Sequence, residues 1–128
     1  MRIMGIDYGS KRVGIAVSDE GAEFALPFAV IPNNADLASE IVEIARENQI
    51  EELVMGESRK DDMSANAILP ATLALKKVLE AHKFTVHMEL EFMTSVAAER
   101  FQGKNDKIDA SAAALILQSF LDTRRSKA

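Results

Sequence analysis

The chain has 128 residues, of which 48% are hydrophobic and 27% are charged, a composition typical of a folded globular protein rather than a disordered one. It contains no cysteine, which excludes disulfides, zinc–thiolate sites and thiol nucleophiles and fits a reducing cytoplasm. The formal net charge of −5 argues against a protein that coats nucleic acid without specificity, because that affinity comes from neutralising phosphates. A chain with this net charge can still bind nucleic acid through a local basic patch.

No charged segment followed by an apolar stretch opens the chain, and no apolar run reaches membrane-spanning length. We therefore expect no membrane partner. The length predicts one domain over residues 1–128.

Three strands are predicted first, over residues 2–7, 12–18 and about 24–31. The first two are close enough in sequence to form a hairpin. Pro27 marks the third as an edge strand or a bulged one, because proline cannot donate to a strand ladder. These strands predict an antiparallel start to the sheet.

Helices and strands are then expected to alternate. The predicted elements are a helix over about 35–47, a strand over 53–56, a helix over 63–82, a strand from 85 to 88, a short helix over about 94–101 and a last helix over about 109–122. Asn33 or Asn34 is expected to cap the first helix, and Pro70 to end or kink the second. Residues 123–128 are expected to form a flexible basic tail. This order predicts a five-stranded mixed α/β sheet with helices on both faces.

Three acidic residues occupy positions that would bring them to one edge of this sheet. Asp7 ends the first strand and Glu91 follows the fifth, and ligands of open α/β sheets gather at the carboxyl ends of strands. Asp109 heads the last helix on the same stripe as Ala112 and Ala113, which must face the sheet. Three carboxylates suit Mg²⁺ or Mn²⁺, ions that activate water and stabilise the leaving oxygen in phosphodiester hydrolysis.

Each acid also has a purely structural interpretation. Asp7 could be a turn residue before Gly9, and Glu91 a solvated acid at a strand end. Asp109 could be the N-cap of its helix, with Asp106 an alternative cap one turn earlier. Spacing alone does not decide between a metal centre and three unrelated side chains.

The run from Gly5 to Asp19 resembles the opening signature of the YqgF/RuvX family. Members are small bacterial ribonuclease-H-like proteins, described as Holliday-junction resolvases and as nucleases that mature the 5′ end of 16S ribosomal RNA. The likeness continues through 91–95 and 98–99, which match an acid-bearing strand end and its following helix, and through 109–121, which match the closing helix. The resemblance implies a ribonuclease-H-like fold and metal-binding carboxylates at Asp7, Glu91 and Asp109, with Mg²⁺ or Mn²⁺ as cofactor.

The chain departs from the family pattern in two places. Leu90 and Phe92 stand where the family usually has Asp and Arg, although Glu89 carries an acid on the same side of the strand as Glu91. The family's Gly-Leu-Pro and Asp-Gly-Ser stretch is replaced by residues 56–64, which changes a substrate-binding loop.

The turn after the first strand is the candidate nucleic-acid contact. Gly9 permits close backbone approach, Ser10 can donate to a phosphate oxygen, and the next two residues are basic. The alternative is a plain solvated hairpin turn. The complete candidate set is Gly9, Ser10, Lys11, Arg12, Arg59 and Lys60.

These observations lead to a metal-dependent endonuclease acting on structured RNA, in the first place precursor 16S ribosomal RNA, as a monomer or weak homodimer in the cytoplasm. One alternative keeps the chemistry and cuts DNA four-way junctions as a two-fold dimer. Another is a phosphotransferase of the actin and sugar-kinase type, which shares an Asp-x-Gly-Ser/Thr turn but needs two lobes and a longer chain. The last is a non-catalytic nucleic-acid or ribosome-assembly module on a degenerate nuclease fold.

Overall fold

The computed structural model describes residues 2–57, 63–90 and 106–127, with side chains described over 2–56, 70–89 and 110–125. Its elements are β1 (Arg2–Tyr8), β2 (Arg12–Ser18), β3 (Ala25–Pro32), α1 (Leu37–Glu47), β4 (Ile50–Glu57), α2 (Met63–Ala81), β5 (Thr85–Leu90) and α4 (Asp106–Lys127). None of the helices in these ranges is both long and apolar enough to cross a lipid bilayer.

The five strands form one sheet in the order β3-β2-β1-β4-β5. Neighbours β1 and β2, and β2 and β3, run antiparallel, whereas β4 runs parallel to both β1 and β5. This mixed sheet of three antiparallel strands followed by alternating helices and strands confirms the predicted fold class.

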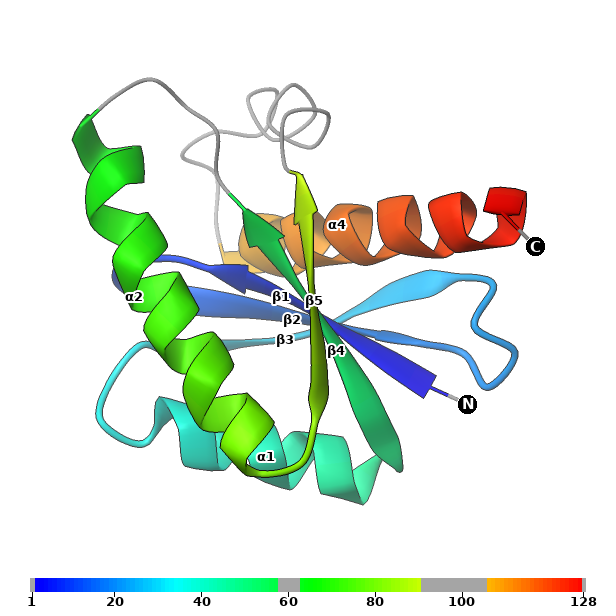
Figure 1. Cartoon of the computed structure of the whole chain (residues 1–128), viewed down its shortest axis with the longest axis horizontal. Helices are drawn as coiled ribbons and strands as arrows, with labels where there is room; N and C mark the ends of the chain where they lie inside the picture. Colours follow the sequence, from blue (N-terminus) through cyan, green and yellow to red (C-terminus); the bar gives the residue numbers. More distant parts are fainter. Residues whose placement is uncertain (1, 58–62, 91–105, 128) are drawn as a thin grey trace.

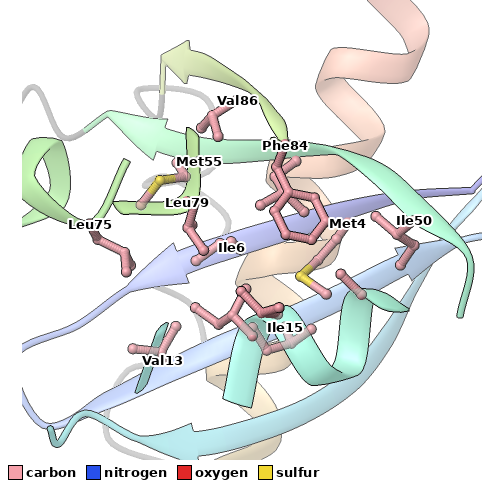
Figure 2. Close-up of a cluster of buried hydrophobic side chains, with 14 of the residues drawn as sticks. Met4, Ile6, Val13, Ile15, Ile50, Met55, Leu75, Leu79, Phe84 and Val86 are labelled. Carbon is pink, nitrogen blue, oxygen red and sulfur yellow. The ribbon is translucent and has the colours of Figure 1, made fainter. Parts of the chain in front are cut away.

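Helices cover both faces of the sheet, with α1 and α2 on one side and α4 on the other (Figure 1). The alternation of strand side chains produces two cores. Met4 and Ile6 of β1 point into the larger core beneath α1 and α2, where Leu79 and Phe84 also lie (Figure 2). Ile3 points the other way, into the core beneath α4.

Helix α4 packs unusually close to β1. A Cβ atom placed on Gly5 would lie 2.7 Å from Cβ of Leu117 and 2.8 Å from the carbonyl oxygen of Ala113. Ala113 and Leu117 are fully buried. Glycine in the strand and alanine in the helix therefore permit a backbone contact that larger side chains would prevent.

The prediction for β3 is confirmed in both respects. The strand lies at the edge of the sheet, and its pairing with β2 shifts register between Ile15 and Ala16. Ala29 pairs with Ile15 and Pro27 with Ala16, so Phe28 is the extra residue of a bulge.

The predicted cap of the first helix is wrong. Helix α1 begins at Leu37 with Asp36 in the N-cap position, and Asp36 makes no side-chain capping bond. Asn34 instead accepts a hydrogen bond at its Oδ1 from the Asp36 backbone N–H, at 2.9 Å. Asn33 is engaged elsewhere, with the turn between β1 and β2.

Other helix ends also differ from expectation. Pro70 lies inside α2 and does not end it. Helix α4 begins three residues before Asp109 and continues through Lys127, so the tail predicted from residue 123 is helical over 123–127. The short helix predicted over 94–101 lies outside the described residues.

Candidate metal and nucleic-acid site

Asp7 lies in the central strand, one residue before its end, and is half-buried. Strand β1 has an antiparallel neighbour on one side, where Asp7 pairs with Gly14, and the parallel strand β4 on the other. The carboxyl ends of β1, β4 and β5 therefore share one edge of the sheet, next to the point where strand direction changes. Ligands of open α/β sheets bind at this kind of position.

The contact between Gly5 and Ala113 relates Asp7 to Asp109. Asp7 stands two residues after Gly5, so strand alternation places it on the sheet face that α4 covers, about 6.6 Å nearer the edge. Asp109 stands four residues before Ala113, on the same face of the helix and about 6 Å nearer its start. Figure 1 shows α4 beginning beside the end of β1. Asp7 is two residues from this contact along β1, and Asp109 is four residues from it along α4. Both lie toward the carboxyl end of β1.

The interpretation of Asp109 as an N-cap does not hold. Helix α4 begins at Asp106, so Asp109 lies within the helix rather than at its flanking position. The structure describes its backbone only. The earlier start leaves Asp109 on the stripe that continues into the buried residues Ala113, Ile116 and Leu117.

Glu91 lies outside the described residues, directly after the last residue of β5. Its neighbour Glu89 is described, and its Oε2 accepts a hydrogen bond of 2.8 Å from the hydroxyl of Ser119. Ser119 is ten residues beyond Asp109, which is about 15 Å along an α-helix. Glu89 is thus held against the middle of α4, away from the start of that helix.

Over the described side chains, no three acidic or histidine groups lie close enough to share a cation. Glu91 and the side chain of Asp109 are not among them, so the metal triad remains a prediction. Its donors fit Mg²⁺ or Mn²⁺, since they are carboxylates and the described one, Asp7, is half-buried at a sheet edge.

The turn that follows Asp7 is tightly folded. A Cβ atom on Gly9 would lie 2.5 Å from the carbonyl oxygen of Arg12, so only glycine fits there. Ser10, Lys11 and Arg12 are exposed and face solvent beside the sheet edge. Arg59 and Lys60, the other predicted nucleic-acid contacts, lie outside the described residues.

Sequence reasoning missed Asn33 as part of this region. Its side-chain Nδ2 donates to the Gly9 carbonyl oxygen at 2.8 Å, and its backbone N–H donates to the Lys11 carbonyl oxygen at 2.9 Å. Its sequence position, just before a helix, favours a cap, and nothing local indicates a partner 24 residues away.

Glu52 of β4 has a shifted pKa, and this residue lies away from the edge where Asp7 stands. The pKa of Glu52 is lowered, first by a hydrogen bond from Arg124 and then by one involving His87, against the opposing effect of burial. Glu52 pairs with Ile3 in the sheet, four positions from Asp7. The network of Glu52 therefore belongs to the packing of α4 rather than to the candidate site.

The sheet order, its helical layers and the acid at the end of its central strand define a ribonuclease-H-like protein. The fold is similar to that of Thermus thermophilus RuvC in complex with a Holliday junction substrate, with a TM-score of 0.66 and 16% identity over 98% of this chain and 96% of the other. That likeness establishes the fold.

The family model described as "RuvX: Holliday junction resolvase" matches residues 1–123. A curated relative from Streptococcus suis, named "Putative pre-16S rRNA nuclease", is 34% identical over 95% of this chain and 98% of its own length. A relative of the same name from Opitutus terrae is 35% identical, over 97% and 93%. The chain belongs to the RuvX family, a family of nucleases, and the resemblance of its motifs to this family is confirmed.

Proposed function

We propose that this chain is a divalent-metal-dependent endonuclease that hydrolyses phosphodiester bonds in structured RNA, acting on the 5′ end of precursor 16S ribosomal RNA in the cytoplasm. The main support for the proposal is the close packing of α4 on β1, where Gly5 meets Ala113. Asp7 is two residues from Gly5, and Asp109 is four residues from Ala113. The names of the curated relatives support RNA as the substrate.

In this proposal Asp7, Glu91 and Asp109 hold Mg²⁺ or Mn²⁺. The ion, when bound, would activate a water molecule as the nucleophile and stabilise charge on the leaving oxygen. Grouping three carboxylates is electrostatically unfavourable without a cation, so the protein alone carries a site poised for one. The half-buried position of Asp7 limits its competing contact with water.

In this proposal the turn after Asp7, from Gly9 to Arg12, binds the backbone of the nucleic acid. The hydroxyl of Ser10 donates to a backbone phosphate oxygen, and Lys11 and Arg12 neutralise neighbouring phosphates. Arg59 and Lys60 extend this surface in the proposal. Contacts to phosphates hold the strand in register, which aligns one bond with the acids without reading sequence.

The decisive experiment compares the unmodified chain with Asp7→Asn and with Asp36→Asn on a precursor 16S RNA with its 5′ extension. Asp36 is an exposed acid at the start of α1 with no side-chain capping bond, so its substitution controls for the loss of one negative charge. We expect Mg²⁺-dependent cleavage by the unmodified chain and by Asp36→Asn. Asp7→Asn should cleave more than about 100-fold more slowly. Replacing even a residue that only hydrogen-bonds to a metal ligand lowers metal affinity or activity about 10- to 100-fold.

The proposal would be rejected if the unmodified chain left the precursor uncut in the presence of Mg²⁺ and behaved in the same way as Asp7→Asn. A melting temperature that does not respond to Mg²⁺ or Mn²⁺ would then favour a non-catalytic module on the same fold, because an ion that binds the native state must stabilise it.

A second candidate, cleavage of DNA four-way junctions, is favoured by the description of the matching family. Symmetric cutting of a junction needs two active sites related by a two-fold axis. The same three proteins incubated with a junction substrate, together with a measurement of mass at micromolar concentration, separate the two candidates. A strict monomer that leaves junctions intact while cutting precursor RNA supports the first.

A further inference from the structure

Asn33 bridges the end of β3 to the turn between β1 and β2. Its Nδ2 donates to the carbonyl oxygen of Gly9 at 2.8 Å, and its backbone N–H donates to the carbonyl oxygen of Lys11 at 2.9 Å. The two bonds hold the carbonyl groups on either side of Ser10. Asn33 is itself half-buried, whereas Ser10 and Lys11 are exposed.

The tip of the turn is exposed. The last β1–β2 ladder pair before it joins Tyr8 to Val13, and beyond that pair Ser10 and Lys11 are exposed. Gly9 is also the residue with the greatest backbone freedom, because it lacks a Cβ. Exposed loop tips sample several conformations unless contacts hold them, and the two hydrogen bonds of Asn33 are contacts of this kind.

We propose that Asn33 is a positioning residue for RNA binding, which fixes the turn from Gly9 to Arg12 so that Ser10, Lys11 and Arg12 meet backbone phosphates beside Asp7. The inference rests on the proposed nuclease function. A turn that is ordered before RNA arrives loses less conformational entropy on binding. The role of Asn33 is therefore in affinity for RNA, and not in metal binding or in the chemical step.

Two substitutions remove the side-chain bond and leave the backbone bond intact. Asn33→Ala deletes the donor, and Asn33→Asp keeps the shape while replacing the donating amide by an acceptor that faces the Gly9 carbonyl oxygen. Asn34→Ala is the matched control, since Asn34 is the adjacent residue and its side chain accepts from the Asp36 N–H instead of contacting the turn. Melting temperatures of all variants show whether each one folds.

We expect Asn33→Ala to weaken RNA binding about 2- to 10-fold, the effect of one net hydrogen bond, with Asn33→Asp at least as weak and Asn34→Ala unchanged. In cleavage assays the KM of Asn33→Ala should rise, while kcat and the Mn²⁺-induced shift in melting temperature should stay unchanged. A purely structural role would lower the melting temperature without this split between KM and kcat.

A double-mutant cycle with Lys11→Ala tests whether Asn33 acts through the turn. If it does, Lys11→Ala costs less in the Asn33→Ala background than in the unmodified chain. The slope of log Kd against log salt should likewise respond to Lys11→Ala only while Asn33 is present, by about 0.7–0.9 per lost phosphate contact.

Strictly additive costs, or Asn33→Ala binding RNA as tightly as Asn34→Ala, would overturn the inference while leaving the nuclease proposal intact. Loss of kcat at unchanged affinity would overturn it as well. If Asn33→Ala does not fold, Asn33→Asp carries the same comparison. An unmodified chain that neither binds nor cuts precursor RNA would overturn the proposed function itself, and the positioning role with it.

Discussion

Arg124 of α4 and Glu52 of β4 form a two-point ion pair, with Nη2 2.6 Å from Oε2 and Nη1 3.3 Å from Oε1. The Nε2 atom of His87 on β5 lies 2.7 Å from the same Oε2. The guanidinium carbon of Arg124 lies 4.6 Å from the centre of the Phe120 ring, a cation–π distance. These contacts attach the last turns of α4 to the parallel half of the sheet.

The ion pair predicts a pH dependence of stability. Arg124 lowers the pKa of Glu52 in the folded protein below its ordinary value of 4.5, so the unfolded chain binds the proton more readily. The stabilisation is fully present above pH 4.5 and is lost as the pH falls through the lower folded-state value. We expect Glu52→Gln to reduce the unfolding free energy by about 1 kcal/mol at pH 7, because Arg124 is 45% exposed and screened by solvent.

Urea denaturation of both proteins between pH 7 and pH 3 measures this difference, which should shrink below pH 4.5. Glu51→Gln, at an exposed neighbouring position on β4, serves as the control and should show little difference at any pH. A Glu52→Gln deficit that stays constant down to pH 3 would contradict the assignment to the ion pair.

The close packing of α4 on β1 predicts that Gly5→Ala is destabilising. The added methyl group would meet Leu117 and the carbonyl oxygen of Ala113 below 3 Å, and a backbone oxygen cannot move aside as a flexible side chain does. We expect a loss of about 1–3 kcal/mol in unfolding free energy, measured by chemical denaturation. Gly21→Ala is the control, since a Cβ there meets its nearest atom at 3.5 Å. Equal stability of the two variants would show that α4 adjusts freely.

The core beneath α4 predicts a second contrast in stability. Leu117 is fully buried against β1, whereas Leu115 of the same helix is 38% exposed. Leu117→Ala should therefore cost about 2–5 kcal/mol, the usual range for a buried leucine, and Leu115→Ala much less. The same denaturation experiment compares them. Similar losses would indicate that α4 is not anchored through the stripe that begins at Asp109.

The position of Glu89 predicts which acid supports metal binding. Mn²⁺ should raise the melting temperature of the unmodified chain, because an ion bound only to the native state stabilises it by about 2.7 kcal/mol at 100 times its Kd. Asp7→Asn and Asp109→Asn should abolish the shift. Glu89→Gln should keep it, since the Glu89 carboxylate is bonded to Ser119. Loss of the shift in Glu89→Gln, with Glu91→Gln unaffected, would instead make Glu89 the ligand.

The elements that could be predicted from sequence are those whose signal is local. Such signals depend only on residues that are close in sequence. They include the alternation in β1 and β2, the proline that marks β3 as a bulged edge strand, and the apolar stripe of α4. The family resemblance also rests on contiguous motifs, and the match over residues 1–123 bears it out. Pattern and motif were therefore enough to determine the fold class and the family.

The partners of particular side chains required the tertiary structure. Asn33 has the sequence environment of a helix cap, yet it bonds to Gly9, and Glu89 is an acid near a predicted ligand, yet it bonds to Ser119. Helix α4 extends through Lys127 where Arg124 meets Glu52, 72 residues away in the chain. Hydrophobic periodicity sets which elements form because burial is a sum over many residues. A single hydrogen bond is worth about 1 kcal/mol, and its partner is chosen by whichever group the folded chain brings within 3 Å.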